Sequence, residues 1–404
     1  MDPRVFYRLT EPTEWAGPPE KYSYSSMKQM SVCLLQWQLG RSKYNELKRY
    51  PERPSEAAYV GVLVHEILNK LFRAMAIAGY PEIGTEDFLA AVKGVDILGK
   101  AKSGLEKFAQ EAHSNPRAIG FRLQSTPRDV YNKVVQAFRL EYAAIAQHAP
   151  ALETRAMQTT EKSTGTRSDL LRIHGFLSEE KVTHPSLPLL GFIDLLVRRD
   201  NQTTILDFKT GAPQPQYRDQ LRLYALMWWR STGDAPTSLE LRYGAKVERW
   251  PVTPEELVDV ETSLEEKIRE YHEGLQRRPA VPTPGDHCNR CGVRQMCNAY
   301  WMAKTNAVPN KDEWVDIEVV VRAVGARGGF VGTNAAGEEI TIVHEDEVTA
   351  KVEPFQVGER LRILNALLDA DGEAVQITRG TEVFRVGHRP RPLRDEAPGN
   401  ICLG

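Results

Sequence analysis

The segment 191–209 constrains the fold of this chain more than any other part of its sequence. Its two short apolar runs have the length and composition of buried β-strands, and each carries one aspartate, Asp194 and Asp207. Lys209 follows two residues after Asp207, and alternation along a strand would place both side chains on one face. The segment therefore predicts two neighbouring strands that carry two carboxylates and a lysine.

These residue types indicate chemistry on a phosphate. A carboxylate in a buried strand is costly unless it is paired or binds a metal ion. Hard oxygen ligands favour Mg²⁺ or Mn²⁺, which lower the pKa of a bound water and neutralise phosphate charge. Lys209 would position that water or stabilise the transition state. Taken alone, Asp207 and Lys209 are better explained as an ion pair on an edge strand, so the interpretation depends on the flanking residues.

Polar residues on both sides extend the pattern. Gln220 and Tyr224 lie four apart on a predicted helix and share one face, where an amide and a phenol become available to a substrate. His65 lies on an apolar helix, where a histidine is more often a packed core residue, but beside two aspartates it becomes a candidate metal ligand. One glutamate is also expected at the site, and spacing leaves four candidates open: Glu153, Glu161, Glu179 and Glu180.

The order of these motifs resembles that of one nuclease family. Gly-x-x-Asp, Asp-x-Lys-Thr-Gly and Gln-Leu-x-x-Tyr, with an upstream Gly-x-x-x-His, are similar to the RecB-type branch of the PD-(D/E)XK nucleases over about residues 23–300. The resemblance implies a set of metal ligands: His65, Asp194, Asp207 and the carbonyl of Phe208. It also implies a catalytic Lys209, with Gln220 and Tyr224 completing the site.

The five cysteines are too few and too unevenly placed for a disulfide framework. Cys288, Cys291 and Cys297 form a Cys-x2-Cys-x5-Cys group, Cys33 lies far upstream, and Cys402 is the odd one. Four thiolates can hold Zn²⁺ or a [4Fe–4S] cluster, although a zinc ribbon usually brings a second close pair. The one-plus-three arrangement resembles the iron-staple nucleases, the AddB-type subunits and CRISPR-associated adaptation nucleases, which implies an architectural [4Fe–4S] cluster.

The chain is predicted to be an α/β protein, and the resemblance implies a restriction-endonuclease-like core. Four parts are expected: a helical part (1–150), the nuclease core with the cysteine group (151–305), a small β-barrel (311–390) and a flexible tail (391–404). Periodicity and caps predict helices through 27–37 and at about 56–78, 85–112, 126–146, 216–229 and 253–275. Core strands are predicted at 170–173, 175–177, 191–197, 203–208, 239–243 and 246–250.

Six short β-rich pieces between 312 and 388 have the length and glycine punctuation of an OB-fold or a similar small barrel: 315–321, 329–333, 339–343, 360–364, 375–378 and 383–386. OB-folds stack bases on aromatic side chains. Trp314, Phe330, Phe355 and Phe384 are candidates for such stacking. The segment is also acidic, so a docking or packing role remains an alternative to single-strand binding.

The net charge of −2 gives no whole-protein attraction to nucleic acid, so a basic groove would have to be local. Candidate basic residues are found in 41–53 and 385–394 and at Arg218, Arg222, Arg230, Arg277, Arg278, Arg290 and Arg294. The chain has no apolar run of about 18 residues and no apolar leader, which indicates a cytoplasmic protein without a membrane segment.

The expected function is a Mg²⁺- or Mn²⁺-dependent DNA nuclease in repair, recombination or phage defence. The resemblance, rather than the residues, suggests exonuclease action on single strands or DNA ends. One alternative is a non-catalytic or partner-activated subunit of a helicase–nuclease, against which the intact Asp194, Asp207 and Lys209 argue. Another is a CRISPR adaptation subunit, which is typically shorter. The chain has no Gly-x4-Gly-Lys-Ser/Thr loop, so unwinding would need a helicase partner.

Overall fold

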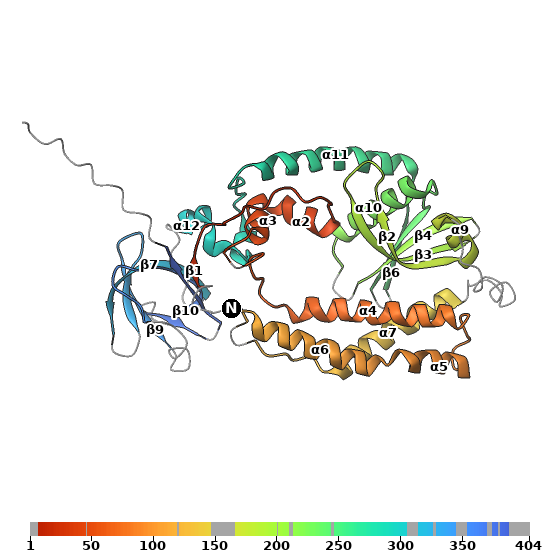
Figure 1. Cartoon of the computed structure of the whole chain (residues 1–404), viewed down its shortest axis with the longest axis horizontal. Helices are drawn as coiled ribbons and strands as arrows, with labels where there is room; N and C mark the ends of the chain where they lie inside the picture. Colours follow the sequence, from red (N-terminus) through yellow and green to blue (C-terminus); the bar gives the residue numbers. More distant parts are fainter. Residues whose placement is uncertain are drawn as a thin grey trace, which may run out of the picture.

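The computed structural model describes residues 7–45, 47–118, 121–146, 166–199, 201–209, 213–243, 246–304, 314–325, 329–344, 354–369, 374–378 and 380–387. A layer of long helices lies along one side of a five-stranded sheet, further helices lie on its other side, and a β-barrel stands at one end of the molecule (Figure 1). No helix in these ranges is both long and apolar enough to cross a membrane.

The N-terminal part is helical, as predicted, and its helices are α2 (Tyr24–Val32), α3 (Leu34–Arg41), α4 (Glu56–Ile77), α5 (Glu86–Val95), α6 (Ile97–Ser114) and α7 (Pro127–Ala146). Two predicted helices are each broken in two. Cys33 has an extended backbone (φ −165°) that ends α2 and begins α3. Asp96 is left-handed (φ 51°) and accepts a hydrogen bond from the Gly99 amide at the start of α6. Cys33 therefore lies at a junction between helices and not inside one.

The sheet has the strand order β2-β3-β4-β5-β6. Its strands are β2 (Phe176–Thr183), β3 (Leu190–Arg199), β4 (Gln202–Phe208), β5 (Ser238–Tyr243) and β6 (Lys246–Pro251). β4 and β5 are parallel, which requires a crossover, and α10 (Gln216–Thr232) supplies it. The other neighbours are antiparallel.

The predicted strand at 170–173 is wrong. These residues belong to α9 (Arg167–His174), which begins with a reciprocal capping box between Thr166 and Asp169. The helix ends at Gly175, whose left-handed backbone (φ 76°) stops it directly before β2. The short apolar run resembled a strand in composition, but the two caps specify a helix.

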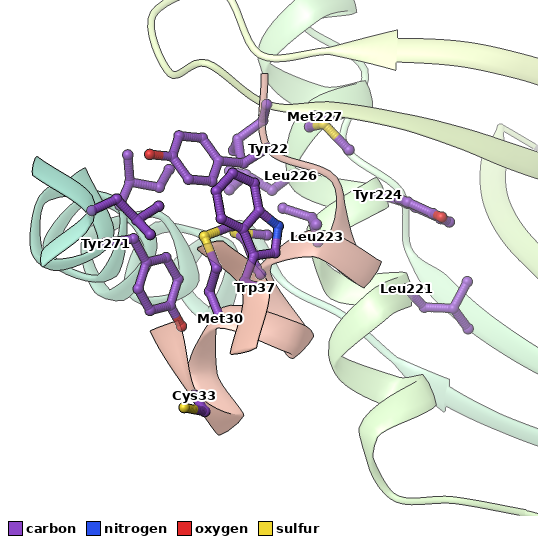
Figure 2. Close-up of a cluster of buried hydrophobic side chains, with 14 of the residues drawn as sticks. Tyr22, Met30, Cys33, Trp37, Leu221, Leu223, Tyr224, Leu226, Met227 and Tyr271 are labelled. Atoms are coloured by element: carbon purple, nitrogen blue, oxygen red, sulfur yellow. The ribbon is translucent and has the colours of Figure 1, made fainter. Parts of the chain in front are cut away.

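Two hydrophobic cores cover the two faces of the sheet. The first lies against α10, α2, α3 and α11 (Pro254–Gln276). Figure 2 shows side chains from each of these helices: Met30 and Trp37 of α2 and α3, Leu223 and Leu226 of α10, and Tyr271 of α11. The second core packs α4, α6 and α7 against the opposite face, where Phe176, Leu195 and Leu206 are buried.

The predicted C-terminal barrel is confirmed. Its strands are β7 (Trp314–Val324), β8 (Phe330–Thr333), β9 (Glu339–His344), β10 (Arg360–Leu368), β11 (Ala374–Ile377) and β12 (Glu382–Val386). The order β10-β11-β9-β8-β7, with β7 also paired to β10, closes five strands into a ring. β12 extends the sheet beyond β10, and β1 (Arg8–Leu9) pairs with β12. The barrel is therefore joined to the N-terminal segment, an arrangement that strand patterning did not predict.

The barrel is docked on the rest of the chain through both apolar and charged contacts. Leu364 and Phe384 belong to the first core, together with side chains of the helices that pack on the five-stranded sheet. Arg117, between α6 and α7, makes a two-pronged ion pair with Glu382 of β12 at 2.8 and 3.1 Å. Both side chains are almost fully buried, at 1% and 4% exposure. The two parts thus share a desolvated interface.

Candidate active site

Asp194 and Asp207 lie side by side on the antiparallel strands β3 and β4. The Asp194 carboxylate (Oδ2) accepts a hydrogen bond from the Phe208 amide at 3.0 Å. Asp207 is 3% exposed, and Lys209 Nζ lies 2.6 Å from its Oδ2 atom. The predicted same-face placement of Asp207 and Lys209 is thus observed.

The helix α10 extends this contact. Lys209 Nζ donates to Gln220 Oε1 at 3.0 Å, and Gln220 Nε2 donates to the Tyr224 hydroxyl at 2.8 Å. The resulting chain runs from the carboxylate of Asp207 through a lysine and an amide to a phenol. The ring of Tyr217 also lies 4.5 Å from Lys209 Nζ and stabilises the cation. These contacts restrict the lysine to one position at the edge of the site.

Gly191 allows Tyr224 to approach the sheet. A Cβ atom at this position would lie 2.6 Å from Tyr224 Cε1 and 2.7 Å from Met227 Cε. Such distances are too short, and an aromatic ring wedged between α10 and β3 has little room to move. The glycine of the Gly-x-x-Asp motif therefore has a steric role that the sequence did not reveal.

The Gly191→Ala variant is expected to lose about 10²-fold in any activity that depends on this site, because a shift of Tyr224 would disturb Gln220 and Lys209. Overpacking should also lower the free energy of unfolding by about 1–3 kcal/mol. Cleavage rates and urea unfolding measure the two effects. Gly40→Ala is the control, since a Cβ there meets nothing within 4 Å. Full activity in Gly191→Ala would rule out the steric role.

His65 reaches the site from α4, on the opposite face of the sheet from α10. Its Nδ1 atom is 3.8 Å from Asp194 Oδ2. Burial lowers the pKa of His65, while the charge of Asp207 and hydrogen bonding with the Phe208 backbone act in the other direction. A neutral imidazole next to a carboxylate and the backbone of Phe208 is the form that binds metal ions.

The carboxyl groups of Asp194 and Asp207 both have raised pKa values. Burial raises the pKa of Asp194 to about 6. Burial, followed by the neighbouring charge of Asp194, raises the pKa of Asp207 to about 7. Two neighbouring carboxyls that resist ionisation, one buried and one partly buried, would be stabilised in their charged form by a divalent cation. The chemistry of the donors, oxygen atoms with one imidazole, therefore fits Mg²⁺ or Mn²⁺.

Within the described ranges, no three His, Cys, Asp or Glu side chains form a group that could hold a metal ion. At Asp207 the positive charge comes from the ammonium of Lys209. An ion pair between Asp207 and Lys209 is what the sequence suggests when these two residues are taken alone, and the structure places that pair beside Asp194 and His65.

The structure separates the four candidate glutamates. Glu180 forms an ion pair with Arg167 at 3.0 Å. Glu179 instead interacts electrostatically with the two aspartates. Its charge raises the pKa of Asp194. Burial raises the pKa of Glu179 itself, the charge of Arg73 opposes this, and Asp207 adds to the rise. Glu153 and Glu161 lie outside the described residues, as do Thr210 and Gly211 of the lysine motif.

Glu179 also marks a distortion in the sheet. It has a left-handed backbone (φ 51°), uncommon for a residue with a side chain. On β3, the strand that pairs with β2 here, Ile193 and Leu195 are two residues apart and should share a face of the sheet. They pack in different cores instead. Asp194 lies between them, so the strand twists at the carboxylate. Such irregularities often aim a side chain into a site.

The four predicted cysteine ligands gather at a second location, but they too are not arranged as a group that could hold a metal ion as they stand. Cys33, at the α2–α3 junction, and Cys288, Cys291 and Cys297 line one cavity. All four are free thiols. Burial raises the pKa of Cys291 to about 11, and the other three cysteines add to the rise. The cavity lies between α3 and the segment formed by η1 (Asp286–Arg290), η2 (Arg294–Met296) and α12 (Asn298–Lys304), whereas Cys402 lies outside the described residues.

The predicted basic residues of α10 do not form a free basic groove. Arg218, Arg222 and Arg230 each pair with a glutamate on β6 or α11: Glu248, Glu256 and Glu261. Arg294 is buried against Asp316 of the barrel. Long-range pairs of this kind depend on tertiary packing and cannot be identified from charge runs.

Three of the four aromatic residues proposed for base stacking on the barrel are in its core or interface. Phe330, Phe355 and Phe384 are 3%, 6% and 0% exposed. Trp314 is 62% exposed and is the one of the four that a base could reach. The prediction of an aromatic stacking surface is therefore wrong for three residues, because strand alternation turns Phe330 and Phe384 inward and Phe355 is buried in the segment that precedes β10.

Comparisons with known proteins support the assignment of the core. A family model described as the PD-(D/E)XK nuclease superfamily matches residues 21–298. No curated protein matches the chain. Solved structures with partial likeness include the tetrameric p202 HIN2, with 17% identity over 20% of this chain and 44% of that chain and a TM-score of 0.17. SSO0001 shows 17% identity over 40% of this chain and 79% of that chain, with a TM-score of 0.19.

A structure described as "Structural mimicry for functional antagonism" shows 9% identity over 56% of this chain and 99% of that chain, with a TM-score of 0.17. The assignment thus comes from the family match, which spans both aspartates, the lysine and the cysteine segment. The chain belongs to the PD-(D/E)XK nuclease superfamily.

Proposed function

We propose that this protein is a Mg²⁺- or Mn²⁺-dependent deoxyribonuclease that hydrolyses phosphodiester bonds. The observation that carries the proposal is the contact chain from Asp207 through Lys209 and Gln220 to Tyr224. A structural ion pair would need only the first two residues. The added amide and phenol give a row of hydrogen-bonding groups beside the carboxyls of Asp194 and Asp207, as a phosphate site requires.

The residues that would hold the metal are Asp194, Asp207, His65 and the Phe208 carbonyl. Of the two candidate glutamates that the structure describes, Glu179 is the one whose charge interacts with the aspartates. The ion would supply a water of lowered pKa and charge for the phosphate. Lys209 would donate to a phosphate oxygen as negative charge develops there. Gln220 orients the ammonium of Lys209, and Tyr224 orients Gln220. In hydrolysis one water is added across the P–O bond, leaving a phosphate and a hydroxyl end.

We further propose that Cys33, Cys288, Cys291 and Cys297 bind one metal group, a [4Fe–4S] cluster with Zn²⁺ as the alternative. Their position at one cavity between distant segments suits an architectural centre. A group that bridges Cys33 to Cys288 would close a loop of well over 100 residues. By the chain-entropy argument used for disulfides, closing a loop of about 100 residues stabilises the folded state by about 4.7 kcal/mol, and longer loops add little more. Iron, sulfide and zinc analysis of the purified protein decides between the two groups. One zinc without iron would exclude the cluster.

Single-stranded DNA or DNA ends are the proposed substrate, by resemblance to AddB-type and CRISPR-associated nucleases, and a helicase is the proposed partner for unwinding. The OB-like barrel would then contribute Trp314, the exposed aromatic residue among the four candidates. The competing function is a non-catalytic or partner-activated DNA-binding subunit. It is favoured by Lys209 being already paired with Asp207, an arrangement that a partner or metal would need to change.

The experiment compares labelled linear single strands, linear duplexes and covalently closed circles, each with Mg²⁺, Mn²⁺ or EDTA. Metal-dependent loss of linear single strands, with circles spared, is expected for an exonuclease. Cleavage of circles would identify an endonuclease. If the wild type cuts nothing with either metal, but still retards DNA in a gel, the non-catalytic function replaces the proposed one.

A further inference from the structure

Three buried guanidinium groups converge on the backbone of the cysteine loop, defined here as residues 291–297. Each donates to a different main-chain carbonyl. The bonds run from Arg294 to Cys291 (3.2 Å), from Arg117 to Gly292 (2.5 Å) and from Arg362 to Gln295 (2.6 Å). The three arginine side chains are between 1% and 8% exposed. The path of the loop between two of the four cysteines is therefore set by charged donors.

The same three guanidinium groups pair with carboxylates of the barrel. The partners are Asp316 for Arg294, Glu382 for Arg117 and Glu318 for Arg362. Asp316 and Glu318 lie on β7, and Glu382 lies on β12. The arginines themselves come from three different places: the loop, the α6–α7 connection and β10. Each guanidinium thus joins one barrel carboxylate to one carbonyl of the cysteine loop.

Neutral side chains secure the same junction. Tyr300 of α12 donates to Asp316 at 2.7 Å, and Arg294 also donates to Asn365 of β10 at 2.8 Å. Arg362 donates to Asn298, the residue after Cys297, at 2.9 Å. Arg362 is also close enough to Cys297 that a thiolate there would stabilise its charged form. These hydrogen bonds therefore hold the segment that contains and follows Cys297 against the barrel.

Breaking this arrangement would be costly for both parts at once. If the barrel moved away, the desolvated guanidinium groups of Arg117 and Arg294 would lose their counter-charges, and the loop would lose the donor Arg362, which would leave with its partner Glu318. Conversely, if the loop changed its path, buried arginine protons would lose their carbonyl acceptors. The loop conformation and barrel docking are therefore stable only together, which makes them thermodynamically linked.

We propose that the barrel is a clamp for the cysteine centre: docking of the barrel preorganises Cys291 and Cys297 to bind a metal group, and the bound group strengthens docking in return. The inference rests on the cysteine centre proposed above. Arg117, Arg294 and Arg362 are positioning residues in this arrangement, since they touch the loop backbone and not the metal ligands' sulfur atoms. Groups that hold the ligands of a metal in place, without binding the metal themselves, orient those ligands and raise the affinity for the metal.

The test uses the full chain with Arg362→Met, the conservative Arg362→Lys and the control Arg322→Met. Arg322 is an exposed barrel arginine that donates to Thr333, away from the loop. Metal content and the rate of metal release to a chelator are measured, with circular dichroism to establish folding. Arg362→Met is expected to release its metal about 10- to 100-fold faster, Arg362→Lys to recover part of the loss and Arg322→Met to match the wild type.

The reverse direction of the coupling is tested with Cys297→Ser, in which limited proteolysis should release the barrel faster than in the wild type. Equal metal release in folded Arg362→Met and wild type would overturn the proposal. If Arg362→Met does not fold, Glu318→Gln takes its place, since it keeps the bond to Gln295 and removes only the barrel charge.

A wild type without bound metal would refute the proposed cysteine centre, and thiol reactivity would then decide the coupling. The clamp predicts that a thiol reagent modifies the loop cysteines faster in Arg362→Met than in the wild type. Equal modification rates would overturn the clamp as well. The two failures are therefore distinguishable.

Discussion

Asp207→Asn is expected to reduce nuclease activity by about 10²–10³-fold with the fold intact. Asparagine keeps the shape of the side chain but removes the charge that faces Lys209 and would attract a divalent cation. Because Asp207 is buried beside Asp194, losing one of two like charges should not destabilise the metal-free protein. Cleavage rates of labelled single strands with Mg²⁺ and with Mn²⁺ measure the loss.

A matched control and a second variant sharpen this prediction. Asp259→Asn changes an exposed carboxylate of α11 and should retain full activity. Lys209→Met should lose activity to a similar extent, yet still show the rise in Tm that Mg²⁺ causes in the wild type, because both aspartates remain. Asp207→Asn should lack that rise. Cleavage by Asp207→Asn at the wild-type rate would refute the site.

Arg117→Met is expected to lower the free energy of unfolding by about 3–5 kcal/mol, because it leaves Glu382 buried without its two-pronged partner. The same change removes the shorter of the two hydrogen bonds donated to the Gly292 carbonyl, the other coming from Gln295, and so should loosen the barrel. Urea unfolding, followed by circular dichroism and by tryptophan fluorescence, measures the loss. Arg322→Met, on the barrel surface, should change stability by less than about 0.5 kcal/mol.

The double variant Arg117→Met/Glu382→Leu decides whether charge or packing explains the loss. Replacing a buried pair with apolar groups is often neutral, so much of the stability should return. A double variant no more stable than Arg117→Met would show that the guanidinium matters for its carbonyl bonds to the loop instead.

The Arg117–Glu382 pair also predicts a pH dependence. Burial alone would raise the pKa of Glu382, but Arg117 and Arg53 outweigh it and hold the pKa below its usual value. The unfolded chain therefore binds the proton more readily, and the pair contributes full stability above the unfolded pKa of about 4.3. This contribution disappears as the pH falls through the lower folded pKa. Wild type should lose stability in that acidic window more steeply than Glu382→Gln, and parallel curves would contradict the assignment.

Local pattern was a good guide to much of this molecule. The alternating barrel segments, the apolar strands of the core and the caps of α4 and α11 were predictable because each depends on neighbours within a few residues. The same is true of Asp207 with Lys209 and of Gln220 with Tyr224, whose spacings match one strand face and one helix face. The errors at 85–112 and 170–173 arose where single residues, Asp96 and Gly175, take left-handed conformations that end or divide a helix.

Contacts between segments that are distant in the sequence could not be predicted from local pattern. The amino-acid order specifies which side chains carry the chemistry, the strand and helix faces that present them, and a cysteine group able to bind metal. Folding alone brought Glu179 toward the aspartates and Glu180 toward Arg167, turned three barrel aromatics inward, and placed Gly191 under the ring of Tyr224. It also joined the barrel to the cysteine loop through Arg117, Arg294 and Arg362. Such pairings depend on which desolvated charges find partners in three dimensions, and that is a property of the packed chain with no local signature.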